Sequence, residues 1–260
     1  MKRTINSLLL TLAITGLMTA CAVTSPNTQT SKNISKLEKK SLLQKANRLN
    51  NQGVKAYRKG DYKSSINYYL ESIKIKEKVL GTEHLNTATS YNNLGLVYKR
   101  TGEYDKALIY ITEGLKIREK SLGRIDSQTA QSYNNLGMLL AAMGKTKKAI
   151  KYTKKTIEIK EQIVHKEKID IAISYNNLAV LQEEAGDYQN ALKSYFKAMK
   201  INEKVFGKEH QVTQGNYANI ALLYYTMKNF DEARKYAKMA KKGSAEEMQL
   251  APITVKGTSE

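Results

Sequence analysis

The sequence predicts an all-α solenoid of stacked helical hairpins, and three observations support this fold class. With 15 Gly, 2 Pro and no Trp in 260 residues, the composition favours regular helix over sheet or irregular coil. A short motif recurs five times in one register, at a spacing of 42 residues. Within each unit the apolar residues lie at i, i+3, i+4 and i+7, the pattern of a helix with one buried face.

Residues 1–20 are predicted to be an export signal peptide. Lys2 and Arg3 supply a positive start, and the apolar stretch Ser7–Met18 that follows is too short to span a bilayer as a helix. Small residues come after it, as they do before a cleavage site. The mature protein is therefore expected to begin near residue 21 and to function outside the cytoplasm.

The end of the signal contains the one cysteine of the chain. The stretch from Leu17 to Cys21 resembles the bacterial lipobox, with Met18 where that pattern prefers Leu. The resemblance implies cleavage before Cys21 and lipid on its sulfur and amine. Ordinary signal peptidase cleavage after Ala22 is the alternative, because Ala20 and Ala22 also frame a small-x-small site.

More than one acyl chain is needed for stable anchoring, and the lipoprotein modification would supply it. Ala22 after the cysteine, and not Asp, resembles the sorting pattern for the outer membrane. We expect a lipoprotein of the outer membrane that faces the periplasm; a soluble periplasmic or secreted protein is the alternative.

The signal is followed by a tether. Residues Val23–Lys32 are mostly Ser, Thr, Asn, Gln and Pro, with little to bury, and order should begin near Asn33. A basic helical run, Ser35–Leu49, leads into the first repeat, and helical periodicity ends after Gly243. The predicted divisions are a flexible tether at 21–34, a repeat domain at 35–242 and a disordered tail at 243–260.

The repeated motif begins with a tyrosine in four of its five copies and continues with asparagine. The copies are Leu49–Gly53, Tyr91–Gly95, Tyr133–Gly137, Tyr175–Ala179 and Tyr217–Ala221. A turn glycine lies in the same phase at Gly60, Gly102, Gly144 and Gly186, and Lys228 and Asn229 replace it in the last unit. Small residues such as Gly95 and Ala107 should let the two helices of a unit approach closely.

These residues resemble the tetratricopeptide repeat. Tyr91, Leu94, Gly95, Tyr98 and Ala107 match its W-x2-L-G-x2-Y and Ala positions, with Tyr in place of Trp. The period is longer than the usual ~34 residues and resembles the kinesin light chain variety. The resemblance implies a right-handed superhelix whose first helices line the concave surface. The repeats are expected at about 46–87, 88–129, 130–171, 172–213 and 214–242.

An asparagine column is the first candidate binding feature, with one member in each unit. An amide side chain offers a donor and an acceptor, so a column of them could pair with the backbone of an extended peptide. The alternative is that the asparagines bond to neighbouring helices and hold the stacking, and both roles could coexist. The column consists of Asn51, Asn93, Asn135, Asn177 and Asn219, with Asn50, Asn92, Asn134 and Asn176 as weaker companions.

Further along the same helices the units differ in charge. The first two units are basic, the third is apolar and the fourth is acidic, so a groove along them would favour one direction of an extended ligand. Solvated helix ends are the alternative. The residues are Arg58, Lys99, Arg100, Met138, Glu183 and Glu184.

Most of the formal charge of +19 lies on the second helices, where we expect a solvated face. This face is predicted to include Lys76 and Arg118, and contact with anionic lipid is possible there. The glutamates that recur with the period mostly have a lysine three residues earlier, with which we expect ordinary helix-surface pairing: Glu77, Glu119, Glu161 and Glu203.

No catalytic constellation appears in the sequence. His84 and His210 belong to equivalent loops three repeats apart, so they cannot meet, and we expect His84 to cap or pack a loop. We therefore expect no enzyme activity, no cofactor, no metal site and no small-molecule substrate, and export disfavours nucleic acid. The predicted function is a membrane-anchored scaffold that binds an extended segment of a partner protein. The alternative is a structural assembly factor of an envelope complex, of pilus or secretion type, working through convex surfaces and helix ends.

Overall fold

The computed structural model describes residues 34–163 and 168–240. The predicted signal, the lipidation site Cys21, most of the tether and the tail lie outside the described residues. Every regular element that the described residues form is a helix. The ten helices are α1 (Lys36–Arg58), α2 (Tyr62–Leu80), α3 (Leu85–Arg100), α4 (Tyr104–Leu122), α5 (Ser127–Ala142), α6 (Thr146–Ile163), α7 (Lys168–Glu184), α8 (Tyr188–Phe206), α9 (Gln211–Thr226) and α10 (Phe230–Met239).

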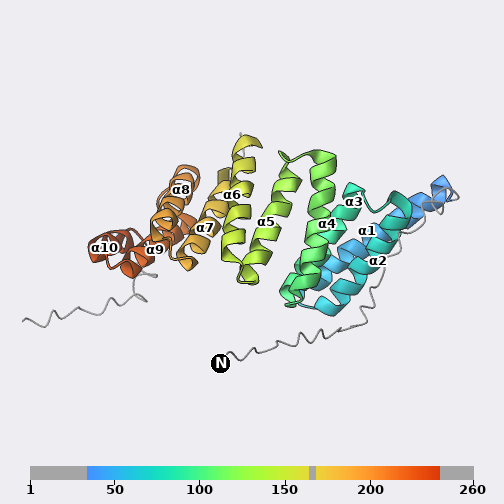
Figure 1. Ribbon diagram of the computed structural model, residues 1–260, viewed down its shortest axis with the longest axis horizontal. Helices are drawn as coiled ribbons and strands as arrows, with labels where there is room; N and C mark the ends of the chain where they lie inside the picture. Colours follow the sequence, from blue (N-terminus) through green and yellow to red (C-terminus); the bar gives the residue numbers. More distant parts are fainter. Residues whose placement is uncertain (1–33, 164–167, 241–260) are drawn as a thin grey trace, which may run out of the picture. The chain divides into compact units, whose positions relative to one another are not determined.

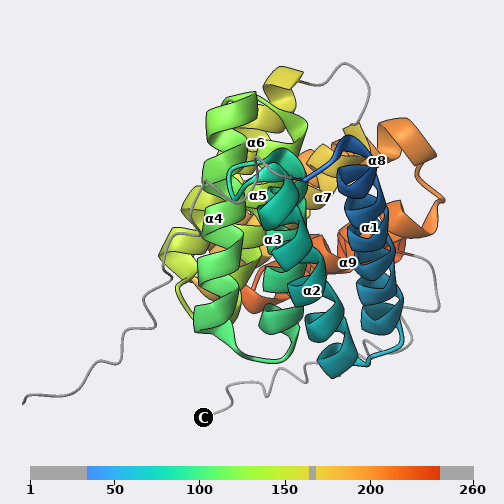
Figure 2. The ribbon, with the colours of Figure 1, turned by 90° about the vertical axis from the view of Figure 1, so that its right-hand side faces the viewer.

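The helices pair into five hairpins that follow one another in chain order (Figure 1). Each first helix packs on its own second helix, and that second helix packs on the first helix of the next hairpin. Beyond consecutive helices, the most extensive contact joins α3 and α5, so first helices of neighbouring hairpins approach one another. Figure 2 views the same stack from the α1 end. The predicted all-α solenoid of five hairpins is confirmed.

The turn within each hairpin needs a backbone conformation that favours glycine. Gly102 has a φ of 82°, in the left-handed region where a Cβ is disfavoured. Lys228 takes this place in the fifth hairpin with a φ of 60°, as the one non-glycine residue of the described chain with positive φ. The fifth hairpin therefore forms the same turn with a lysine, at the cost of backbone strain at Lys228.

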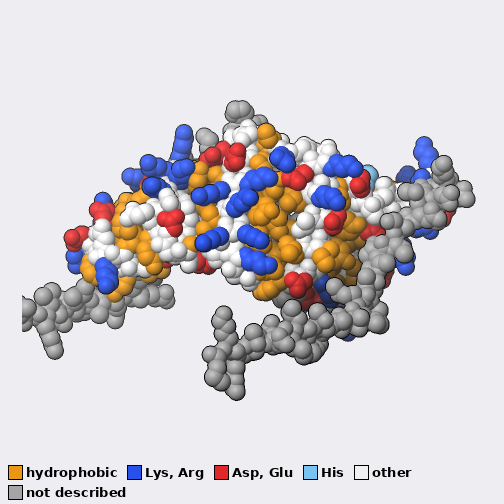
Figure 3. All heavy atoms as spheres, viewed as in Figure 1, with side chains coloured by type: hydrophobic (Ala, Val, Ile, Leu, Met, Phe, Trp, Pro, Cys, Tyr) orange, Lys and Arg blue, Asp and Glu red, His pale blue; other side chains and the backbone are white. Residues whose placement is uncertain are grey.

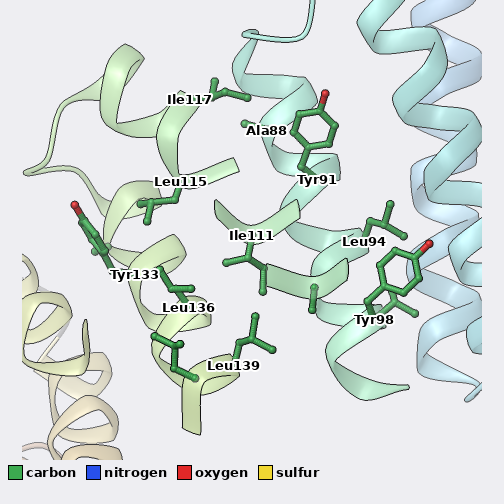
Figure 4. Close-up of a cluster of buried hydrophobic side chains, with 14 of the residues drawn as sticks. Ala88, Tyr91, Leu94, Tyr98, Ile111, Leu115, Ile117, Tyr133, Leu136 and Leu139 are labelled. Carbon is green, nitrogen blue, oxygen red and sulfur yellow. The ribbon is translucent and has the colours of Figure 1, made fainter. Parts of the chain in front are cut away.

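Close approach of the two helices in a hairpin requires the small residues that the sequence indicated. A Cβ built at Gly95 would lie 2.6 Å from Ile111 Cγ1 and 3.2 Å from the Ala107 carbonyl oxygen. Tyr91 and Leu94 are buried beside this contact, within one continuous cluster (Figure 4). The predicted core stripe of α3 is confirmed.

In α3, α5, α7 and α9, a tyrosine bonds back to the glutamate of the preceding second helix. The Tyr91 hydroxyl donates to Glu77 Oε1 at 2.6 Å, and the Tyr217 hydroxyl donates to Glu203 Oε1 at 2.6 Å. Equivalent bonds join Tyr133 to Glu119 and Tyr175 to Glu161. The expected pairing of these glutamates with a lysine three residues earlier is wrong, because the stacking of hairpins brings the tyrosine within reach.

A second set of polar contacts lies deeper in the same junctions. Lys76 is only 4% exposed and donates to Ser90 Oγ at 2.8 Å. Arg118 is 3% exposed and donates to Ser132 Oγ at 2.8 Å. Burial lowers the pKa of both cations. The prediction that Lys76 and Arg118 belong to a solvated face is therefore wrong, since both point between hairpins.

Candidate functional site

The first helices together present one surface, which we call the first-helix face. A groove opens on it between α5 and α7, with a volume of about 480 Å³. We call it the α5–α7 groove. Its walls combine amide and hydroxyl groups, exposed apolar side chains and the charged residues Lys160 and Asp170. The lining residues are Ser127, Gln128, Gln131, Asn134, Asn135, Met138, Lys160, Ile163, Asp170, Ile173, Ser174 and Asn177.

The predicted asparagine column divides into two environments. Asn135 is 7% exposed and its Nδ2 donates to Asn92 Oδ1 of the preceding hairpin at 3.0 Å. Asn219 donates to Asn176 Oδ1 at 3.2 Å in the same manner. These two asparagines therefore act in stacking, the alternative that the sequence left open. Their role in binding a peptide backbone stays a prediction.

The other members of the column are more accessible than Asn135, and Asn219 is itself partly exposed. Asn51 is exposed, and Asn93 and Asn177 are partly exposed. Asn177 lines the α5–α7 groove opposite Asn134, one of the weaker companions. The groove therefore brings together amides from two neighbouring hairpins, one from each position of the Asn-Asn pair.

An apolar column runs along the same face, and the sequence interpretation recognised only one of its members. Met138, Val180 and Leu222 are 43%, 39% and 52% exposed, large fractions for apolar side chains, and they lie on the successive first helices α5, α7 and α9. The 42-residue register was the signal that could have found the column. In chain order it consists of Val54, Leu96, Met138, Val180 and Leu222. Exposed apolar surface rimmed by polar groups is typical of a binding site.

The predicted charge gradient also lies on this face. Arg58, Arg100 and Glu184 are exposed, and Glu184 lines a smaller pocket next to the α5–α7 groove. Lys99 is half-buried, and burial lowers its pKa. Glu183 accepts a hydrogen bond from the Tyr195 hydroxyl at 3.1 Å, so it is partly committed to packing.

The second helices carry a different surface. A groove between α4 and α6 has apolar residues such as Leu108 and Tyr152 below and lysines at its edge, including Lys145 and Lys148. Figure 3 shows lysine and arginine side chains gathered around a strip of hydrophobic side chains near α5 and α6. One lysine of this groove, Lys155, has its Nζ 3.8 Å from the Tyr133 ring centroid, and this cation–π contact restricts its side chain.

The described histidines cap helices. His84 Nδ1 accepts from the Asn86 amide at 3.0 Å, and His210 Nδ1 accepts from the Val212 amide at 3.2 Å. The expected capping role of His84 is confirmed. Within residues 34–163 and 168–240, no three His, Cys, Asp or Glu side chains gather in a way that could hold a metal ion. None of the helices described has both the length and the apolar character to cross a membrane.

Comparison with known families identifies the repeat. One family model described as tetratricopeptide repeat matches residues 46–120 and 170–243, and a second with the same description matches residues 129–165. A search of curated proteins gives no matching relative.

Solved structures with the same fold include relatives of the kinesin light chain. BtubC (BKLC) from P. vanneervenii is 19% identical with a TM-score of 0.67, over 86% of this chain and 95% of that one. Repeats of a Podosopora anserina protein named as a kinesin light chain are 18% identical with a TM-score of 0.66, over 81% and 96%. The apo form of RapI is 19% identical with a TM-score of 0.66, over 78% and 70%. At these identities the likeness concerns the fold.

Proposed function

The chain belongs to the tetratricopeptide repeat family, and from this premise we propose that it is a membrane-anchored scaffold which binds an extended segment of a partner protein along its first-helix face. The family fold is generally a scaffold for protein–protein interaction and not an enzyme. The observation that carries the proposal is the α5–α7 groove, where amides of Asn134 and Asn177 flank the exposed side chain of Met138.

The groove suits a peptide because it offers two kinds of contact together. Amides can satisfy the backbone donors and acceptors of an extended chain whatever its sequence. The apolar column supplies contact area between those amides. The charge gradient from Arg58 and Arg100 to Glu184 would then favour one direction of the bound segment, because a reversed segment would place like charges together.

Site-specific photo-crosslinking in the cell can test which face is used. A photoreactive residue at position 138, on the first-helix face, is expected to capture a discrete partner protein. The matched control is position 148 on α6, where Lys148 is also exposed and lines the groove between α4 and α6. Capture only from position 148 would contradict the proposal and favour the assembly factor that works through second helices.

Two asparagine variants separate binding from stacking. Asn177→Ala removes a groove amide and is expected to weaken capture while leaving the melting temperature nearly unchanged. Asn135→Ala leaves Asn92 without its partner and is expected to lower stability by about 1 kcal/mol. If both variants melt early and bind normally once folded, the column serves stacking alone.

The membrane anchor rests on Cys21, which lies outside the described residues. Its lipobox context and the absence of other cysteines support it as the lipid attachment site. Cys21→Ser is expected to release the protein into the soluble fraction of the envelope or to block its processing. Unchanged membrane partitioning of Cys21→Ser would refute lipid anchoring at this residue.

A further inference from the structure

The third hairpin departs from its neighbours at the contact between its two helices. In the second hairpin Ile111 fills the space opposite Gly95 so fully that a Cβ there would lie 2.6 Å away. In the third hairpin Thr153 stands in place of Ile111, and a Cβ at Gly137 would lie 3.2 Å from Thr153 Oγ1. The first and fourth hairpins have tyrosines at this position. Among the first four hairpins the third therefore has the smallest side chain at this position, and only Ala237 of the last hairpin is smaller.

Thr153 lines a pocket of about 230 Å³ between α5 and α7, which we call the notch. Ala141 lies on its α5 side, where the neighbouring hairpins have Lys99 and Glu183. Small-molecule sites typically exceed ~300 Å³, so the notch suits one large side chain better than a separate ligand. Its lining residues are Asn134, Met138, Ala141, Thr153, Asn177, Val180, Leu181 and Glu184.

We infer that the notch is the anchor site for one large apolar side chain of the partner segment, placed next to a lysine or arginine of that segment. The inference rests on the proposed function and names the chemistry of its ligand. Met138, Val180 and Leu181 form an apolar wall, and a methionine adapts its shape to the side chain that enters.

The lysine or arginine of the partner segment is inferred from charge complementarity with Glu184. Glu184 is exposed at the rim of the notch and forms no ion pair with any residue of the described chain. The α5 side offers no charge of its own, since Met138 and Ala141 lie there. The chain has a formal charge of +19, so the negative charge of Glu184 contrasts with the protein as a whole. It would attract a lysine or arginine of the bound segment.

The experiment is selection of a random-peptide display library on the full chain, followed by affinity measurement of the enriched peptides. We expect enriched peptides to share a Leu, Ile, Met or Phe adjacent to a Lys or Arg. Thr153→Ile should weaken their binding at least tenfold by filling the notch. This variant is expected to fold, because the pairing of Ile111 with Gly95 already exists one hairpin earlier.

A second variant and a matched control complete the design. Ala141→Met closes the notch from the α5 side and should have the same effect if Thr153→Ile folds poorly. Thr112→Ile makes the same chemical change at an exposed site of α4 and should leave binding unchanged. Glu184→Gln should remove the preference for a basic neighbour while keeping the apolar one.

The outcomes separate the notch from the groove. Some enriched peptides could block capture of the partner from position 138 and yet bind Thr153→Ile and Ala141→Met as tightly as the wild type. That result would overturn the notch and retain the proposed function. Enrichment without a shared apolar residue would also overturn it. Enrichment of no peptide on the wild-type chain would count against both proposals.

Discussion

The α4–α5 and α8–α9 junctions lie at the same place in the repeat but contain different buried polar groups. At the first, Arg118 donates to Ser132 Oγ at 2.8 Å. At the second, Asn202 Nδ2 donates to Asn216 Oδ1 at 2.6 Å. All four side chains are at least nine-tenths buried. The repeat therefore preserves a buried hydrogen bond at this place and does not preserve a charge.

The two junctions also share features. Each has the tyrosine–glutamate hydrogen bond, from Tyr133 to Glu119 in one and from Tyr217 to Glu203 in the other. Leu136 and Ile220 occupy the same buried position of their first helices. Both junctions therefore require the buried apolar residue and the tyrosine of the first helix. The more deeply buried polar pair can be of different chemistry.

The largest effect is expected at the shared apolar position. Leu136 is 4% exposed and Ile220 is fully buried, so replacing either by Ala should lower stability by about 2 to 5 kcal/mol. Thermal melting monitored by circular dichroism measures the loss. The comparison requires losses of similar size at both junctions. An unchanged melting temperature for Leu136→Ala would contradict the burial of this side chain in the core between α4, α5 and α6.

Alkaline pH should weaken the tyrosine–glutamate bond. Burial and the hydrogen bond to Glu203 raise the pKa of Tyr217, and burial with the bond to Glu77 raises the pKa of Tyr91. A tyrosine in the unfolded chain ionises near ~10, so this contribution is complete below that pH and is lost as pH rises toward the folded pKa. Each such tyrosine can remove at most ~1.4 kcal/mol per pH unit.

The measurement is the denaturant midpoint of unfolding between neutral pH and pH ~11. We expect a falling midpoint above the unfolded-state pKa of tyrosine, ~10, and a smaller fall for Tyr217→Phe. Tyr69 provides a comparison without a glutamate partner, because burial, with a smaller contribution from Tyr57, raises its pKa to about 12. A midpoint that stays constant through this range would contradict the burial of these hydroxyl groups.

Removing a single tyrosine hydroxyl should distinguish the two junctions at neutral pH. Tyr217→Phe leaves Glu203 without its donor and should cost about 1 kcal/mol. Tyr133→Phe should cost less, because Glu119 keeps Lys155 at 3.7 Å and Arg124 at 3.9 Å. Melting temperatures of both variants test the order, and a larger loss for Tyr133→Phe would reverse it.

The sequence was sufficient for the hairpins because their signals are local. The helix period, the turn at Gly102 and the contact of Gly95 with Ile111 all lie within one unit. The 42-residue register then placed the same contacts in every unit. These are the parts of the fold that the structure confirms.

The junctions and the site were predicted less well, because they depend on the offset between hairpins. Periodicity shows which side chains share a face of a helix and does not show which of them the next hairpin covers. Arg118 was therefore assigned to solvent although it is buried. For Asn135 the sequence left stacking and peptide binding open, and only the structure shows its bond to Asn92. The notch was missed because Thr153 is unusual only by comparison with Ile111 and the tyrosines at its position.

The smallest effect is expected from exchanging the deeper polar groups. Arg118 has no carboxylate within hydrogen-bonding distance, and its Nε has no hydrogen-bond partner among the described residues. Burial lowers its pKa, which is the signature of a cation held at a cost. Arg118→Met should therefore change stability by no more than about 1 kcal/mol, in either direction, because a long apolar chain replaces a poorly compensated charge of similar length.

At the α8–α9 junction, introducing a lysine–serine pair tests whether the buried polar pair is interchangeable. The double variant Asn202→Lys with Asn216→Ser introduces there the arrangement that Lys76 and Ser90 form between α2 and α3, where the two polar atoms are 2.8 Å apart. If the pair is interchangeable, this variant folds with a stability within about 1 kcal/mol of the wild type, whereas Asn202→Lys alone loses more by crowding Asn216. A double variant as unstable as the single one would show that the last junction has a geometry of its own, and that the polar pair is specified separately at each junction.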